Sequence, residues 1–382
     1  MTFHVSLPHE IADATERTML LFDLAAGEQD FQAADTILAE LLPGQKTQGI
    51  NGERVTFGEF KITVVPYSFS KVRNEEVHRR LWSAGVISID PERVAAMPAA
   101  PQALVDGQQG FDIIAALGLG GNYPYRGLGI TVAVLDSGIA KDHPDFVNRH
   151  PTVLKISEFQ DGYDDLGHGT HCIGVACGIR PYGIADESKI LSVRVYSQNK
   201  APTETRVIQG LQLARDNGAN VATLSLNWRP FSNEPSPQLE RVGRQLLDVN
   251  RILVIASGAR SSGDVTPPAN CNSIMAIGSV GPNLEVSSFA PHMVAGGDPV
   301  DAVAYGENIL SACLNSQHCV AYGNSMATAL AGGIAAVWAG KNSALRGAKL
   351  WEAMVDAATT ASLATPQFKY VGAGLLQPPK WP

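Results

Sequence analysis

The sequence predicts an α/β fold, a doubly wound parallel sheet preceded by a small α+β domain. From about residue 108 onward, short and almost wholly apolar runs alternate with helical segments, the pattern of a parallel sheet that helices bury on both faces. Residues 1 to about 100 mix helical segments with strand-like runs instead. Small residues and prolines at 96–103 separate the two parts and predict an exposed linker, where a proteolytic cut would fall. We therefore expect two domains, 1–100 and 101–382.

Composition and charge exclude several classes of protein. With 382 residues, 45% of them hydrophobic and 17% charged, the chain can bury a large core and disorder is not expected. The net charge is −8 and Lys and Arg form no cluster, so the sequence predicts no positively charged surface that would bind nucleic acid. The sequence has no apolar stretch of about 20 residues, so it predicts no membrane span. The first residues lack the features of a secretory signal, so we expect a cytoplasmic protein, or a secreted one if a leader is missing.

The N-terminal domain has the element order of a ferredoxin-like layer, β-α-β-β-α-β. Asn74 can cap the second helix, with acidic residues in the first turn, where the helix dipole favours them. The expected strands are 18–24, 54–57, 60–65 and 85–90, and the expected helices are 31–42 and 74–84.

The larger domain supplies apolar strands with helices between them. The expected strands are 130–135, 190–195, 221–226, 252–256 and 274–278, and the expected helices are 204–217 and 237–250. In such sheets ligands bind beyond the carboxyl ends of the strands. Asp136, Ser225 and the pair Ser257 and Gly258 all stand at such ends. We therefore expect a site at that edge of the sheet.

Ser325 follows a glycine and an asparagine, at the start of a long run of small apolar residues. Such a run predicts a helix that is buried on all sides. At the N-terminus of a helix, free N–H groups and the positive end of the dipole favour a developing negative charge. A nucleophile also needs a base and an orienting carboxylate. His168 and Asp136 are the candidates, which gives the chain order Asp, His, Ser.

The three segments that carry these residues resemble the Asp, His and Ser signatures of the subtilisin-like serine peptidases, the subtilase family. The segment 168–172 and the short connection after it resemble the proteinase K branch. The resemblance covers roughly residues 108–378. It implies a subtilisin-like fold and a serine endopeptidase that hydrolyses peptide bonds through an acyl-enzyme intermediate. Separately, the element order of the N-terminal domain and its closing strand resemble the propeptide of this family, which assists folding and inhibits the enzyme as an intramolecular partner. The alternative is an unrelated α+β domain.

The resemblance assigns a role to each candidate residue. Ser325 would be the nucleophile, His168 would take its proton and return it to the leaving amine, and Asp136 would hold the His tautomer and stabilise the imidazolium. Singly, each residue has an alternative: Asp136 could form a turn, Ser325 could cap a helix, and His168 with His171 could indicate a metal. The segments Ser225, Leu226, Asn227 and Ser257, Gly258 resemble the walls of the family's substrate groove, where an extended peptide pairs as an added strand.

The resemblance breaks at the oxyanion hole. The family places an Asn side chain directly after the Gly of its Ala-Gly-Asn segment, where this chain has Gly258 and then Ala259. In subtilisin, loss of that donor lowers kcat about 10²–10³-fold. We expect weakened activity, because the backbone N–H of Ser325 remains. Asn324 is a candidate replacement donor, and the alternative is that it only fits the turn.

Two other functions remain open. One is a catalytically silent subtilisin fold that binds peptides or a partner protein, and the other is a peptide ligase or macrocyclase on the same fold. We expect no cofactor and no metal, since the turn at 178–183 lacks the insertion through which some relatives bind calcium.

The five cysteines predict no disulfide framework, because their number is odd and the chain is large. Cys313 and Cys319 are near enough in sequence to pair, but without an export signal we expect the cysteines to be mostly free and buried. Their spacing matches no zinc pattern.

Overall fold

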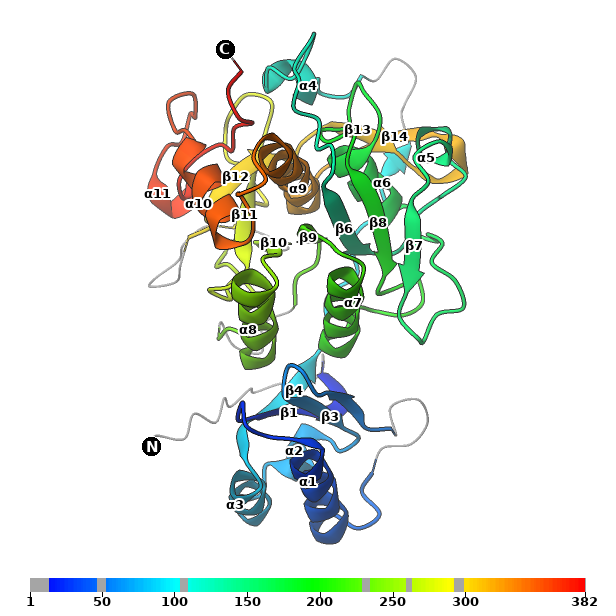
Figure 1. The fold of residues 1–382 in the computed structure, drawn as a ribbon, viewed down its shortest axis with the longest axis vertical. Helices are drawn as coiled ribbons and strands as arrows, with labels where there is room; N and C mark the ends of the chain where they lie inside the picture. Colours follow the sequence, from blue (N-terminus) through cyan, green and yellow to red (C-terminus); the bar gives the residue numbers. More distant parts are fainter. Residues whose placement is uncertain are drawn as a thin grey trace.

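The structure, a computed structural model, describes residues 14–46, 53–103, 109–228, 234–258, 263–291 and 299–381. A small N-terminal layer lies against a larger body that contains a seven-stranded sheet (Figure 1). This confirms the predicted fold class, a parallel α/β sheet preceded by an α+β layer with an antiparallel sheet.

The N-terminal layer has the predicted element order. Its strands pair antiparallel in the order β2-β3-β1-β4, as in a ferredoxin-like sheet. Asn74 Oδ1 accepts a hydrogen bond from the Glu76 N–H at 2.9 Å and so caps α3 as predicted. The elements are β1 (Ala14–Phe22), α1 (Glu28–Leu41), β2 (Val55–Phe57), β3 (Ile62–Val65), α2 (Phe69–Val72), α3 (Glu75–Ser83) and β4 (Val86–Arg93).

Strand β4 runs three residues past the predicted end at 90. These residues pair with β1 and also lie against the larger body, where the Arg93 N–H donates to Glu204 at 3.0 Å. The prediction ended this strand too early, because residues 91–93 are polar or proline and their partners are distant, more than 70 residues away in β1 and more than 100 in the larger body.

All seven strands of the large sheet run parallel, in the order β12-β11-β10-β9-β6-β8-β7. Five match predicted runs, and the two edge strands, β7 and β12, were not predicted. The strands are β6 (Thr131–Asp136), β7 (Thr152–Lys155), β8 (Lys189–Arg194), β9 (Val221–Leu224), β10 (Leu253–Ser257), β11 (Met275–Val280) and β12 (Ala302–Tyr305).

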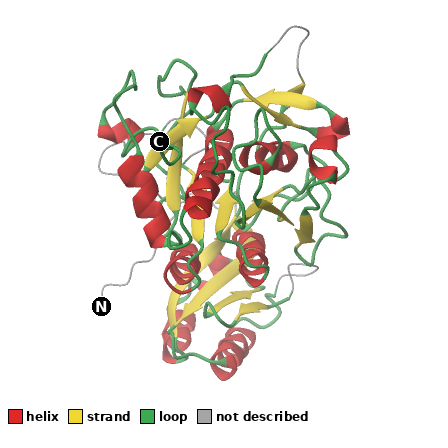
Figure 2. Cartoon of the chain, turned by 45° about the horizontal axis from the view of Figure 1, so that its top comes forward, coloured by secondary structure: helices red, strands yellow, loops and turns green. Residues whose placement is uncertain are grey.

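Helices pack on both faces of this sheet (Figure 2). Gly210 of α7 (Glu204–Asp216) packs on Leu135, whereas Gly332 of α9 (Asn324–Lys341) packs on Thr223. Leu135 lies beside Leu224 in the ladder, so Leu135 and Thr223 point to opposite faces. Helix α6 (His168–Cys177) lies beside α9. As predicted, α9 is almost wholly buried.

Other helices complete the body. The predicted helix 237–250 consists of α8 (Pro237–Arg244) followed by a turn of π-helix, Gln245–Val249. The remaining short or C-terminal helices are α4 (Ile113–Ala116), α5 (Pro144–Val147), α10 (Ala348–Ala357) and α11 (Phe368–Val371). Among the described residues, no helix combines the length and apolar character needed to cross a membrane.

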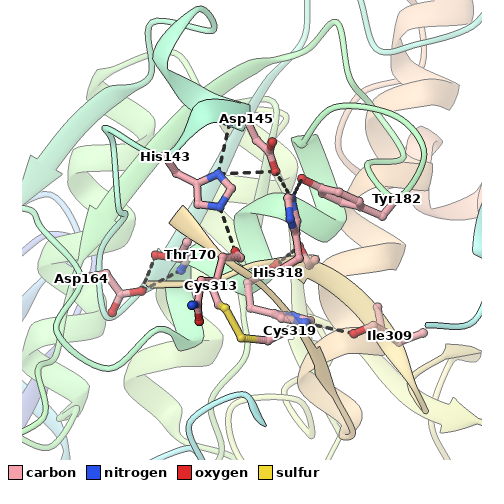
Figure 3. The surroundings of a disulfide bond; sticks show 12 residues. His143, Asp145, Asp164, Thr170, Tyr182, Ile309, Cys313, His318 and Cys319 are labelled. Carbon is pink, nitrogen blue, oxygen red and sulfur yellow. Dashed lines mark hydrogen bonds and ion pairs between the residues drawn. A yellow bond between two sulfur atoms is a disulfide. The ribbon is translucent and has the colours of Figure 1, made fainter. Parts of the chain in front are cut away.

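One expectation about the cysteines is wrong. Cys313 and Cys319 form a disulfide across the hairpin of β13 (Ile309–Ala312) and β14 (His318–Ala321) (Figure 3). The hairpin holds their Cα atoms 5.8 Å apart, which is within disulfide range. The other three cysteines are free and buried, as predicted.

Candidate active site

The predicted site residues gather at the carboxyl edge of the large sheet. Asp136 ends β6, Ser225 directly follows β9, and Ser257 ends β10. Helices α6 and α9 begin at the same edge with His168 and Ser325 in their first turns. A cavity of about 340 Å³ is lined by His168, the groove residues Ser225, Leu226, Asn227 and Ser257, and Asn324 and Ser325.

Asp136 and His168 form a buried pair. His168 Nδ1 lies 2.9 Å and 3.0 Å from the two carboxylate oxygens of Asp136, and both side chains are almost fully buried. The Ser137 N–H donates to the same carboxylate at 2.7 Å. Asp136 therefore fixes the ring so that Nε2, the outer nitrogen, is left for a reaction partner.

Local sequence explains why His168 begins its helix there. The Asp164 carboxylate accepts hydrogen bonds from the N–H groups of Gly167 and Thr170, at 2.9 and 2.8 Å, and so ties the preceding loop to the first turn. Gly167 has φ of +87°, a left-handed conformation that favours glycine. The close approach of Gly169 to the Gly138 carbonyl leaves no room for a Cβ.

Burial and charge act in opposite directions on His168. Burial alone would lower the pKa of its imidazole, but the adjacent Asp136 carboxylate outweighs burial and raises the pKa well above its ordinary value. The pair therefore stabilises an imidazolium, the form that a general base takes after it accepts a proton.

Tyr196 belongs to this cluster and was not predicted. Its hydroxyl donates to Asp136 Oδ1 at 2.6 Å and lies 3.1 Å from His168 Nδ1. Burial and the Asp136 charge raise the pKa of Tyr196 well above its ordinary value, so the phenol keeps its proton. The sequence signal that could have found Tyr196 is its position two residues after β8, at the same edge of the sheet as Asp136.

Two residues of α6 near His168 have other roles. Cys172 Sγ lies 3.8 Å from His168 Nδ1, and burial raises the pKa of this thiol, so it stays protonated. His171 Nε2 instead lies 3.1 Å from the Ile309 carbonyl oxygen. Burial lowers the pKa of His171 to about 3, so the ring is neutral and donates to that carbonyl. The alternative of a metal held by His168 and His171 finds no support in this arrangement.

The nucleophile candidate and its neighbour start α9. Ser325 is half-buried, and its carbonyl accepts a hydrogen bond from Ser225 Oγ at 3.1 Å. Asn324 is buried, and its Nδ2 donates to the Phe289 carbonyl at 3.0 Å. Ala259, where the family has its Asn donor, lies outside the described residues.

Glycine and asparagine shape the two groove segments. Asn227 Nδ2 donates to the Ser257 carbonyl at 2.9 Å and so ties the two segments together. A Cβ at Gly258 would meet Pro291 at 2.6 Å, so packing requires glycine there.

The stretch expected to be an exposed linker lies along the groove instead. The Ala95 N–H donates to the Pro202 carbonyl at 2.8 Å, and the Ala96 N–H to the Asn227 carbonyl at 3.2 Å. Residues 96–101 line the cavity beside His168 and Ser325. Strand β5 (Gln102–Ala103) then pairs antiparallel with β14. The expectation is therefore wrong except at Ala99 and Ala100, which are exposed, because the prolines favour an extended chain that can pair as a strand.

A carboxylate–imidazole pair and a helix-terminal serine that line one groove, where extended chain also pairs, are features of serine peptidases. Residues 127–374 match the family model described as the subtilase family. The chain belongs to the subtilase family of serine peptidases.

Individual relatives agree with this assignment. The chain is 31% identical to subtilisin Savinase from Lederbergia lenta over 63% of its own length and 87% of that protein. It is 32% identical to M-protease from Shouchella clausii (strain KSM-K16), over 58% of this chain and only 57% of that protein. A crystal structure of a cold adapted subtilisin-like serine proteinase superposes with a TM-score of 0.60 and 27% identity, over 68% of this chain and 93% of that one.

Proposed function

We propose that the protein is a serine endopeptidase that acts through an acyl-enzyme intermediate, with Asp136, His168 and Ser325 as its catalytic residues. Ser325 Oγ attacks the substrate carbonyl carbon while its proton passes to His168, which then protonates the leaving amine. Water repeats the sequence to release the acid. Asp136 holds the ring and the charge that forms on it. The observation that carries the proposal is the segment 95–101, which hydrogen-bonds to the groove through Ala95 and Ala96 and lines the cavity with His168 and Ser325 from Ala96 onward.

The same strand supports the proposal that the N-terminal domain inhibits the enzyme. A substrate peptide would need the carbonyl groups of Pro202 and Asn227 that Ala95 and Ala96 already use. An outside substrate therefore binds only after this segment leaves the groove. We propose that residues 1–100 are a propeptide and that 101–382 form the catalytic domain.

Buried ion pairs support a docked N-terminal domain. Arg93 lies 3.2 Å from the Glu204 carboxylate, and both side chains are buried. The carboxylate of Glu92 accepts the Thr205 N–H at 3.2 Å, in the first turn of α7, and lies 3.8 Å from Arg17. Acidic groups are favoured there by the helix dipole.

A second candidate function is a silent fold that binds peptides. It is favoured by Ala259, which has no side-chain donor for an oxyanion. A ligase on the same fold would differ from a hydrolase in its products when an amine nucleophile is added.

We also propose that the protein works in an oxidising compartment, so that the secreted alternative replaces the cytoplasmic one. The disulfide between Cys313 and Cys319 supports this, because disulfides persist in such compartments and are rare in the cytosol. Alkylation and mass analysis of protein from its native source would detect the bond, and two free thiols there would contradict the proposal.

The test of the peptidase is the intact mass of purified full-length protein over time, beside Ser325→Ala. We expect the parent alone to be cut between residues 96 and 108. If neither protein is cut, and an added outside protease that removes the N-terminal domain releases no peptidase activity, the silent fold becomes the better account.

A further inference from the structure

A cluster of side chains of the kinds that bind metals lies beside the disulfide hairpin (Figure 3), and it shares no residue with the pair Asp136 and His168. His143 caps α5, Asp145 lies in its first turn, and His318 begins β14. Asp145 Oδ2 lies 2.9 Å from His318 Nε2 and 3.5 Å from His143 Nδ1. The Tyr182 hydroxyl lies 3.0 Å from the same nitrogen of His318. The ligand atoms of His143, Asp145 and His318 thus lie within 4.8 Å of one another, with the Tyr182 hydroxyl against one of them.

The hydrogen bonds fix which nitrogen of His143 faces the cluster as an acceptor. The Asp145 N–H points at His143 Nδ1 at 3.2 Å, so Nδ1 carries the lone pair. His143 Nε2 then bears the proton and donates to the Gln317 carbonyl at 2.9 Å. A ligating histidine typically presents one nitrogen to the metal and donates the other N–H to a carbonyl in this way.

We propose that His143, Asp145 and His318 bind one divalent transition-metal ion of the Zn²⁺ type, with the Tyr182 hydroxyl or a water as the fourth ligand. Zinc takes imidazole and carboxylate ligands at about 2.0–2.2 Å in a tetrahedron, which sets neighbouring ligand atoms about 3.3–3.4 Å apart. His318 Nε2 lies 2.9 Å from Asp145 and 3.0 Å from Tyr182, and His143 Nδ1 lies 3.5 Å from Asp145. Each of these distances needs only a small movement to reach the spacing of a tetrahedral site. Calcium is not suited, because it takes six to eight oxygen ligands.

The cluster is enclosed yet open to ions from one side. His143 and Asp145 are buried, whereas the side chain of His318 is 39% exposed. An ion would have to displace the Asp145 N–H from the lone pair of His143 Nδ1 and the hydrogen bond between His318 Nε2 and the Asp145 carboxylate, so this hydrogen-bonded cluster is the state with which it competes. Because β14 leads to Ser325 and pairs with β5, an ion here would tie α5 to the strand that borders the groove.

The test uses tag-free, chelator-treated full-length protein carrying Ser325→Ala, so that the chain stays intact. Calorimetric titration with ZnCl₂ should show one bound ion, and Co²⁺ should give the absorption of a tetrahedral site. In His318→Gln, which keeps a hydrogen-bond donor for Asp145, we expect at least about tenfold weaker binding and loss of that absorption. His150→Gln is the matched control, since His150 is exposed and five residues from Asp145, and it should bind like the parent.

Two results would overturn the proposal. One is no Zn²⁺ binding up to about 1 mM, an affinity of no more than about 4 kcal/mol. The other is a site whose affinity changes less than about tenfold in His318→Gln and equally little in His143→Gln, which would place the ion elsewhere, for example at the group of Asp136, His168 and Cys172.

Discussion

The change Tyr196→Phe removes one buried hydroxyl group from the cluster of Asp136 and His168 and keeps the ring. The hydroxyl donates to Asp136 Oδ1 at 2.6 Å. A hydrogen bond to a charged group contributes about 1.5–3 kcal/mol. Asp136 keeps the Ser137 N–H and the His168 ring, so no unpaired charge results. We therefore expect the free energy of unfolding to fall by about 1.5–2 kcal/mol, at the low end of that range.

The same change should shift the pH dependence of catalysis. Tyr196 draws part of the negative charge of Asp136 away from His168. Without the hydroxyl, the carboxylate attracts the imidazolium more strongly, and the pKa of His168, already raised by Asp136, rises further. His168 is a base only when neutral. The acid limb of kcat/KM should therefore move to higher pH, while the maximal rate changes by less than about tenfold.

The assay is kcat/KM against pH on a peptide substrate, with processed enzyme, and denaturant unfolding in the Ser325→Ala background. Tyr163→Phe is the control, because Tyr163 is 47% exposed and should change neither measurement. An acid limb that stays in place or moves to lower pH would refute the account of Tyr196.

Three further changes test other parts of the molecule. Arg93→Met leaves the buried Glu204 carboxylate without a counter-charge, so docking of the N-terminal domain should weaken by about 3–5 kcal/mol. The amide hydrogens of β4 should then exchange with solvent faster, whereas the control Arg79→Met, which removes an exposed ion pair, should leave their exchange unchanged. Asn324→Ala should lower kcat about 10²–10³-fold if its amide serves the oxyanion; an unchanged kcat would leave Asn324 a role in the turn only. Replacing Cys313 and Cys319 together by serine should lower the free energy of unfolding by about 2–2.5 kcal/mol for so short a loop, and equal stability of the reduced and oxidised parent would contradict this.

Most residues of the candidate site could be predicted from the sequence. Ligands bind beyond the carboxyl ends of parallel strands, and these ends can be located from apolar runs, which are local patterns. Asp136, Ser225 and Ser257 each follow an apolar run. Tyr196 also follows such a run, but a tyrosine there is equally consistent with more core. Its role depends on the register that sets Asp136 beside Arg194, and that register arises only when the strands pair.

Contacts between distant segments were beyond the sequence. His143 and Asp145 are two residues apart, but the third side chain of their cluster, His318, lies 173 residues after Asp145. The groove strand was missed for another reason. The partners of Ala95 and Ala96 are backbone carbonyls, which every residue has, so composition gives no sign of the pairing.

Strand β1 shows what inhibition by the N-terminal domain would require. Its apolar run predicted a strand, but not that alternate residues enter different cores. Leu20 and Phe22 pack under the helices of their own layer, whereas Met19 and Leu21 join the core of the larger body. Burying each such side chain contributes about 1.5–3 kcal/mol. A cut in the groove would release only the groove segment, residues 95–101. The rest of the N-terminal domain would stay docked through the apolar face of β1 and the ion pair of β4. In the proposed enzyme, inhibition should therefore outlast the first cut until the N-terminal domain itself is degraded.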